Sequence, residues 1–264
     1  MFLNCAFHVK NSGLSCEQCS HSRTIGQVNA PRTARDRARA ELTRDIKDVA
    51  RQLIERDGAP ALSLREVSRE MGMGASTLYR YFRNRDELLT ALIIDAFDQL
   101  GGAAEDADAD ARRAGADGGA RWLAACRAVR RWALAHPREF ALIYGSPVTG
   151  YTAPADTIGP ATRITRVLAA ILADSLAAGE LTVPEHPLPG PRLVTPEILA
   201  AYGPIAPPHE DLIERALVLW IALIGAISFE LFGHLSNTVT DYAAYFDAAM
   251  RITAPCAGLG LPAS

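Results

Sequence analysis

Apolar residues recur at helical spacing along most of the chain beyond residue 34. The first such segment has a period of about 3.6 residues, carried by Leu42, Ile46, Val49, Ala50, Leu53 and Ile54. Gly58 and Pro60 follow at once, and both residues disfavour the continuation of a helix. The pattern therefore predicts one helix from about Arg35 to Asp57.

Two short helices are predicted next. One begins at Ser63, whose side chain can cap the backbone while Glu66, three residues later, completes a capping box. The segment Gly72-Met73-Gly74 then breaks the chain, and a second short helix covers roughly Ala75–Phe82.

A longer helix is predicted from about Asp86 to Leu100. Asn84 precedes it, and Glu87 is placed for a second capping box. Its broad apolar face consists of Leu88, Leu89, Leu92, Ile93, Ala96 and Phe97. Residues 101–119 are mostly Ala, Asp and Gly, which predicts a flexible connection.

The second half of the chain is also expected to be helical. Helices are predicted at 120–136, where Pro137 ends or restarts the chain, and at 157–178, 210–235 and 240–253. Half of the 16 prolines lie between Gly179 and His209, which predicts a long loop with at most a short helix near Glu197. With no convincing strand pair, the fold class is predicted to be all-α.

The pattern divides the chain into three parts. Residues 1–33 are expected to form a disordered N-terminal tail, because they lack periodicity and are rich in Ser, Asn and Gly. Residues 34–100 are expected to form a three-helix domain and residues 119–255 a second helical domain. Cys16 and Cys19, with His8 and His21 nearby, lack the second cysteine pair of a zinc site, so free thiols and no metal are expected.

Charge and cysteine content narrow the class of protein. Between Arg32 and Leu89 there are 13 Lys and Arg against 10 Asp and Glu, although the whole chain carries −3. A basic head on an acidic body is expected when one end meets DNA. Five cysteines without a secretory signal indicate a reducing cytoplasm. The apolar run 216–229 is too short to cross a bilayer and predicts a buried helix.

The segment Ser63–Leu89, SLREVSREMGMGASTLYRYFRNRDELL, has the form of a helix-turn-helix. Such a motif places the N-terminal residues of its second helix in the major groove of DNA. Leu78 and Phe82 lie four residues apart and supply the apolar side that docks this helix, while its first residues are short or polar.

Over residues 40–95 the sequence resembles the TetR/AcrR family of transcriptional regulators. The resemblance rests on Leu-Ser-Leu-Arg-x-Val, the glycine turn, Ser-x-Leu-Tyr-x-x-Phe, and a basic residue, here Arg85, before Leu-Leu. The segment from Trp220 to Gly225 resembles the Trp-His-Gly motif of one subgroup, with Ile224 in place of the histidine. The resemblance implies a homodimer whose C-terminal domain binds an effector.

Eight residues are expected to contact double-stranded DNA, namely Arg65, Ala75, Ser76, Thr77, Tyr79, Arg80, Tyr81 and Arg85. Arg80 is suited to a bidentate contact with guanine, and Arg85 to the phosphate backbone. For Arg65 the alternative is a surface salt bridge with Glu66 or Glu70. The arginines at 32, 35, 37 and 39 form either an arm that enters the minor groove or a solvated helix start.

In the second domain Trp132, Tyr144 and Trp220 are the candidate effector-binding residues, the alternative being that these rings fill the core. The predicted function is a cytoplasmic repressor that leaves a pseudo-palindromic operator when a small molecule binds. No catalytic residue, cofactor, metal or membrane is expected.

An enzyme and a helical scaffold are the alternative classes. Gly72 and Gly74 follow a helix, and Thr77 stands where a dinucleotide fingerprint needs its third glycine. The segment around Ser76 lacks the closing glycine of a nucleophile elbow, and no His-Glu-x-x-His zinc motif occurs. A scaffold would not need a capped helix-turn-helix with a basic, polar front.

Overall fold

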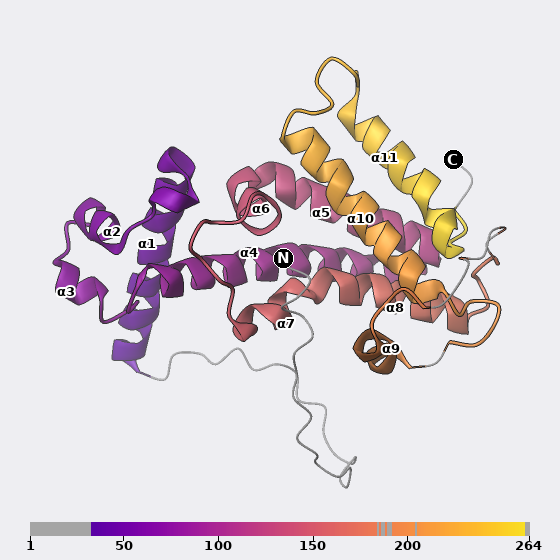
Figure 1. The fold of residues 1–264 in the computed structure, drawn as a ribbon, viewed down its shortest axis with the longest axis horizontal. Coiled ribbons are helices and arrows are strands. Elements are labelled where there is room, and N and C mark those ends of the chain that lie inside the picture. Colours follow the sequence, from indigo (N-terminus) through magenta and orange to yellow (C-terminus); the bar gives the residue numbers. More distant parts are fainter. Residues whose placement is uncertain (1–32, 184, 186–187, 189–191, 204, 262–264) are drawn as a thin grey trace, which may run out of the picture. The chain divides into compact units, whose positions relative to one another are not determined.

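The structure is a computed structural model that describes residues 33–261 apart from 184, 186, 187, 189–191 and 204. Every regular element among these residues is a helix, which confirms the all-α prediction (Figure 1). The chain divides into two compact units, of which the first runs to Leu92 and includes Val148–Tyr151. The second unit contains Ile93–Pro147 and the chain from Thr152 onward. The predicted tail, with its cysteines and histidines, lies outside the described residues.

The first unit contains α1 (Ala34–Asp57), the 3-10 helix η2 (Ala59–Ala61), α2 (Leu64–Glu70), α3 (Ala75–Leu78) and the first turns of α4 (Arg85–Arg113). Its core is built from fully or almost fully buried apolar residues of all four α-helices, among them Ile46, Leu53, Val67, Leu78, Leu88 and Leu89. This packing fixes the short helices, which would not be stable alone.

Local signals in the sequence locate most helix ends in this unit. α1 ends at Gly58, which has a φ of 83°. The Ser63 hydroxyl accepts a hydrogen bond from the Glu66 amide at 3.2 Å, so the predicted cap is present. The reciprocal half of the capping box is absent among the described contacts, because the Glu66 carboxylate pairs with Arg56 and Arg69 instead.

Two expectations about helix length were wrong. α3 stops at Leu78 rather than Phe82, and residues 79–81 continue as a turn. α4 runs to Arg113, so most of the expected flexible connection is helix. In that extension Ala104 and Asp108 are buried, and the Asp108 carboxylate accepts hydrogen bonds from the Arg121 guanidinium at 2.7 and 3.1 Å.

The second unit is a helical bundle. Besides the rest of α4 it contains α5 (Gly118–Ala135), α6 (Pro137–Tyr144), η3 (Ala155–Thr157), α7 (Ile158–Ala161), α8 (Arg163–Ala177), α9 (Pro196–Tyr202), α10 (Leu212–Leu231), α11 (Tyr242–Thr253) and η4 (Ala254–Ala257). Pro137 restarts the chain as α6, and α9 is the short helix expected near Glu197. α5, α8 and α10 pack against one another, with Trp122, Phe140, Ile171 and Leu223 among their buried residues and those of α6.

The helix predicted at 157–178 is interrupted. α7 ends at Ala161 and α8 begins at Arg163, with Thr162 between them. The Thr162 hydroxyl donates to the Gly159 carbonyl at 2.9 Å, and its amide is shared between the Ile158 and Gly159 carbonyls. The bond to Ile158 is the regular helical one, so the additional bonds to the Gly159 carbonyl tighten the turn at Thr162 rather than end the helical path of the chain.

α10 is longer than the 14-residue apolar run expected there. It has 20 residues, with a mean hydropathy of 2.0 over an 18-residue window, and by length and composition alone it could cross a membrane. The length argument from the sequence therefore does not hold for the whole helix. One face of α10 is nevertheless buried in the bundle, through Leu212, Ile213, Leu219, Leu223 and Ile227, which is how a core helix of a globular domain behaves.

Candidate DNA interface and sensor site

The connection between α2 and α3 is a tight turn held by its own hydrogen bonds. Gly72 has a φ of 62°, a conformation that residues with a side chain rarely adopt. The Ser68 hydroxyl donates to the Met73 carbonyl, and the Met73 amide donates to the Ser68 carbonyl, both at 2.9 Å. The turn thus joins two short helices in a compact helix-turn-helix within the first unit.

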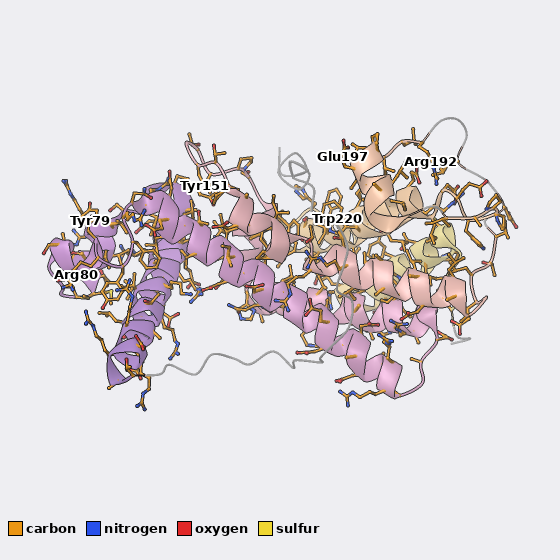
Figure 2. The ribbon with its side chains drawn as sticks, turned by 90° about the horizontal axis from the view of Figure 1, so that it is seen from below. Tyr79, Arg80, Tyr151, Arg192, Glu197 and Trp220 are labelled. Carbon is orange, nitrogen blue, oxygen red and sulfur yellow. The ribbon has the colours of Figure 1, made fainter. Side chains whose placement is uncertain are left out.

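The segment from Ala75 to Phe82, called the recognition segment below, has a buried back and an exposed front. Leu78 and Phe82 are buried at the i and i+4 positions, as the sequence predicts. Ala75, Ser76, Tyr79 and Arg80 are exposed, whereas Thr77 and Tyr81 are partly exposed. Figure 2 shows Tyr79 and Arg80 together at one end of the unit. The structure therefore brings together the residues expected to face DNA.

Two basic side chains of the helix-turn-helix are exposed and uncommitted. Arg65 and Arg80 make no side-chain hydrogen bond or ion pair with the part of the chain that the structure describes. The salt bridge considered for Arg65 is not formed there, because Glu66 pairs with Arg56 and Arg69. Both guanidinium groups are thus available to an anionic partner.

Arg85 is committed within the first unit instead. Its Nε donates to the Leu62 carbonyl at 3.0 Å, and Nη2 donates to the Ala59 carbonyl at 3.1 Å and the Pro60 carbonyl at 3.4 Å. The side chain therefore fastens the start of α4 to η2. Sequence reasoning did not find this role, since its partners lie more than 20 positions earlier.

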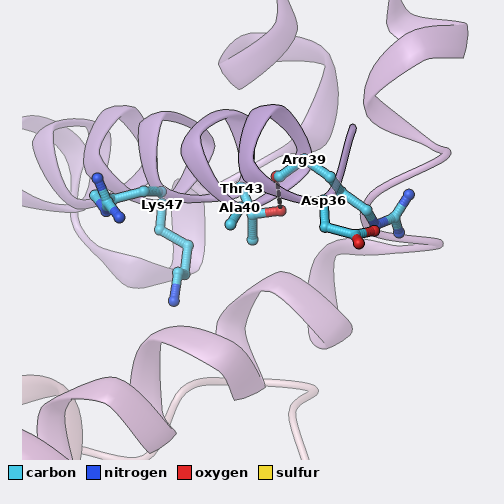
Figure 3. Close-up of a pocket in the computed structure, with 6 residues that line it drawn as sticks. Asp36, Arg39, Ala40, Thr43 and Lys47 are labelled. Carbon is cyan, nitrogen blue, oxygen red and sulfur yellow. Dashed lines mark hydrogen bonds between the residues drawn. The ribbon is translucent and has the colours of Figure 1, made fainter. Parts of the chain in front are cut away.

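The arginines at the start of α1 belong to the helix. Thr33 caps α1 by accepting a hydrogen bond from the Asp36 amide, so Arg35, Arg37 and Arg39 lie in its first turns, while residue 32 lies outside the described residues. One side of this helix forms an open hollow of about 480 Å³ lined by Asp36, Arg39, Ala40, Thr43, Arg44 and Lys47 (Figure 3). The structure supports the helix-start alternative for the three described arginines.

The three candidate effector residues all lie in the second unit. Burial raises the pKa of Tyr144, and the neighbouring Trp220 side chain partly offsets this rise. The Tyr144 ring also contacts Phe97 and Phe140, at centroid distances of 5.9 and 5.2 Å. The sequence places Phe97 on the apolar face of its predicted helix and Phe140 in a wider group of aromatic residues considered as pocket lining, but it does not predict that both rings contact Tyr144.

Trp132 is buried and stacks on His136 with ring centroids 4.9 Å apart. Its indole Nε1 is buried and has no hydrogen-bond partner among the described residues. A buried donor without an acceptor costs free energy, so an acceptor atom on a ligand could satisfy Trp132 Nε1.

Comparison with known proteins decides the family. Residues 46–92 match the family "Bacterial regulatory proteins, tetR family", and residues 122–253 match "Tetracyclin repressor-like, C-terminal domain". The HTH-type transcriptional regulator Rv1816 of Mycobacterium tuberculosis is 36% identical over 222 residues, which cover 81% of this chain and 92% of that protein. The chain belongs to the TetR family.

Solved structures agree with this assignment. Regulatory protein SCO4313 is 31% identical with a TM-score of 0.64, and the match covers 84% of this chain and 98% of that chain. A tetR-family protein from Rhodococcus RHA1, 16% identical with a TM-score of 0.56, shows the same fold. The protein is therefore a DNA-binding transcriptional regulator, and its relatives are named as regulators rather than as enzymes.

Proposed function

We propose that this TetR-family regulator is a cytoplasmic repressor that binds a pseudo-palindromic operator as a homodimer and leaves it when a small, largely apolar effector binds. The observation that carries the proposal is the recognition segment, whose apolar back is buried while Arg80 extends from its front without a partner among the described residues. Such a segment is suited to the major groove of DNA.

The proposed contacts divide by chemistry. Arg80 reads a guanine through its O6 and N7 atoms, because a guanidinium matches both acceptors at once. Ala75, Ser76, Thr77 and Tyr79 line the groove or reach phosphate, and Arg65 binds the backbone from the start of α2. Tyr81 and Arg85 are the remaining two of the eight residues expected to contact DNA. Both already have partners within the first unit, Tyr81 in Arg39 and Arg85 in the Leu62 carbonyl.

A dimer is required because one recognition segment covers too few base pairs for useful specificity. Two segments on one face of the duplex need half-site centres about 34 to 36 Å apart. α10 offers a dimer surface, since Val218, Ile221, Phe229 and Phe232 are exposed along it. On sequence alone, the helices expected at 210–235 and 240–253 are both candidates for the dimer contact, with surplus apolar residues at Leu219, Leu223, Ile227, Leu231 and Tyr245. The first three are buried within the protomer and cannot serve, whereas Leu231 is partly exposed and Tyr245 is exposed.

The effector is proposed to bind beside Trp132, Tyr144 and Trp220. Aromatic rings offer contact area at a small entropic cost, and the buried Trp132 Nε1 donor calls for one acceptor oxygen or nitrogen on the ligand. Release needs only a ligand that prefers the DNA-free state. A 100-fold preference corresponds to about 2.7 kcal/mol, which is an ordinary coupling energy.

Selection of bound duplexes from a random pool tests the DNA proposal. We expect two inverted half-sites about one helical turn apart and a Kd that rises steeply with salt. Arg80→Ala should cost about 1 to 3 kcal/mol per half-site and relax the preference at one base pair. Arg80→Lys is the matched control that keeps the charge but loses the bidentate contact. Recovery of unrelated sequences with the wild-type protein would refute the proposal.

Calorimetry with a metabolite library, run with free protein and with protein saturated by the selected duplex, tests the effector proposal. Linkage requires a true effector to bind DNA-bound protein more weakly than free protein. Trp132→Phe should weaken binding of the hit, because it removes the Nε1 donor and keeps an aromatic ring. A hit with equal affinity for both forms would show that release does not work in this way.

A further inference from the structure

Arg80 lies beyond the end of the helix that is meant to present it. α3 ends at Leu78, and the next residues form a turn in which the Arg80 amide donates to the Thr77 carbonyl at 3.2 Å and the Tyr81 amide to the Leu78 carbonyl at 2.9 Å. A bidentate contact needs its backbone held to within about half an ångström. Something outside α3 must therefore restrain residues 79–81.

Arg39 of α1 reaches this turn from 41 positions earlier in the chain. Its Nη2 donates a long hydrogen bond, 3.5 Å, to the Arg80 carbonyl. Its guanidinium carbon also lies 4.9 Å from the centre of the Tyr81 ring, in cation–π geometry. Carbonyls at a helix end lack helical partners and attract cations, so a guanidinium is well placed here.

We propose that Arg39 is a positioning residue for sequence recognition. It holds the backbone of Arg80 through the carbonyl and the neighbouring Tyr81 through its ring, while Leu78 and Phe82 hold the opposite side by burial. The inference rests on the proposed role of Arg80 in reading a base. It assigns to α1 a part in specificity that is separate from any phosphate contact.

The position of Arg39 on α1 is consistent with a role in positioning the recognition segment rather than in phosphate contact. The Thr43 hydroxyl donates to the Arg39 carbonyl at 2.8 Å, one turn along the same helix (Figure 3). Asp36, Arg44 and Lys47 line the same open hollow as Arg39. Arg44 can supply charge to a phosphate, whereas the Arg39 guanidinium contacts the recognition segment.

The test compares full-length wild type with Arg39→Lys, on the selected duplex, on the same duplex with the base pair read by Arg80 changed, and on a random duplex. Lysine keeps the charge but cannot keep the planar, multi-donor contact. We expect discrimination between the first two duplexes to fall about three- to tenfold. Affinity for the random duplex and the salt slope should stay unchanged.

Tyr81 provides matched controls. Tyr81→Leu removes the ring and should lower discrimination like Arg39→Lys. Tyr81→Phe keeps the ring and should retain discrimination, and any contact of its hydroxyl with phosphate would show as an equal weakening on all three duplexes. In an Arg80→Ala background, Arg39→Lys should have no further effect on discrimination. Circular dichroism checks that each variant is folded, and if Arg39→Lys is not, the Tyr81 pair decides the question.

Several results would overturn the proposal. One is full discrimination in both Arg39→Lys and Tyr81→Leu, and another is an equal loss in the Arg80→Ala background. A third is an equal weakening on all three duplexes with a smaller salt slope, which would make Arg39 a phosphate contact. If wild type itself shows no base preference, the proposed function fails and not merely the role of Arg39.

Discussion

At the scale of single residues, Arg80 and Arg85 show that a basic residue in a DNA-binding motif can have either a free or a hydrogen-bonded side chain. Both were expected to touch DNA, and the spacing in the sequence treats them alike. The structure separates them, because the Arg80 guanidinium has no partner among the described residues while the Arg85 guanidinium donates to three carbonyls. The difference depends on η2, more than 20 residues earlier, so no local pattern could predict it.

Replacing Arg85 should test which of its two roles prevails. Arg85→Ala removes the donor to the Leu62 carbonyl and one of two donors to the Ala59 carbonyl, which keeps the Leu62 amide. We therefore expect the first unit to lose about 1 to 3 kcal/mol of stability. Urea unfolding measures this loss. The salt slope of DNA binding should not change if the role is structural, and it should fall by about 1 per lost phosphate contact if it is not. Arg65→Ala is the comparison. Because the Arg65 guanidinium has no partner among the described residues, this variant should lower the salt slope without changing the free energy of unfolding.

At the scale of elements, sequence reasoning succeeded where a local signal ends a helix and failed where a distant contact does. Ser63, Gly58 and Pro137 mark helix ends through their own chemistry. The extension of α4 through residues rich in Ala, Asp and Gly depends on a buried pair between Asp108 and Arg121, on the next helix. Helix propensity depends on nearby residues only, so it could not predict that Arg121 pairs with Asp108.

The ion pair between α5 and α10 gives a test of packing. The Arg130 guanidinium donates to both carboxylate oxygens of Glu230, at 2.8 and 2.7 Å, and lies 5.4 Å from the Phe246 ring centre on α11. Glu230→Gln leaves a mostly buried charge without its counter-charge, so we expect a loss of about 2 to 3 kcal/mol in the free energy of unfolding. Glu180→Gln, at an exposed position, is the control. An equal stability of both variants would contradict a structural role for the pair.

The ion pair between Arg127 on α5 and Asp247 on α11 should make the free energy of unfolding depend on pH. Hydrogen bonding to Arg127 lowers the pKa of Asp247 below its ordinary 3.8. A lowered folded-state pKa adds stability above the unfolded-state pKa, and this contribution is lost as pH falls through the folded value. The stability difference between wild type and Asp247→Asn should therefore be full at pH 7 and shrink below about pH 4. Urea unfolding across this range measures it, and a difference that grows in acid would have the wrong sign.

At the scale of the whole molecule, the chain passes between the two units more than once. α4 starts in the first unit and continues in the second, and Val148–Tyr151, between α6 and η3, belongs to the first unit. There the Tyr151 and Thr90 hydroxyls are hydrogen-bonded at 2.8 Å. The sequence predicts the shared helix. The return of residues 148–151 to the first unit could not be predicted, because they carry no periodic pattern.

The exposed face of α10 leads to a prediction about the working assembly. Val218, Ile221, Phe229 and Phe232 recur at helical spacing, and between them Gly225 has no atom within 4 Å of the position of an added Cβ, so close approach of a second helix is sterically open. Apolar surface of this extent on a regulator is expected to be covered by a partner. A second copy of the chain is the partner that a two-fold symmetric operator requires.

Phe229→Glu places a charge in that face and should convert the protein to a monomer at micromolar concentration, as measured by sedimentation. Operator affinity should fall steeply, because two half-site contacts no longer reinforce each other, and the salt slope should drop to about half as phosphate contacts per complex are halved. Leu193→Glu is the control, since Leu193 is 71% exposed in the loop before α9, and it should remain a dimer. A dimeric Phe229→Glu variant with full operator affinity would place the dimer surface elsewhere, since a buried, unpaired carboxylate at the contact costs far more than a dimer of ordinary stability can absorb.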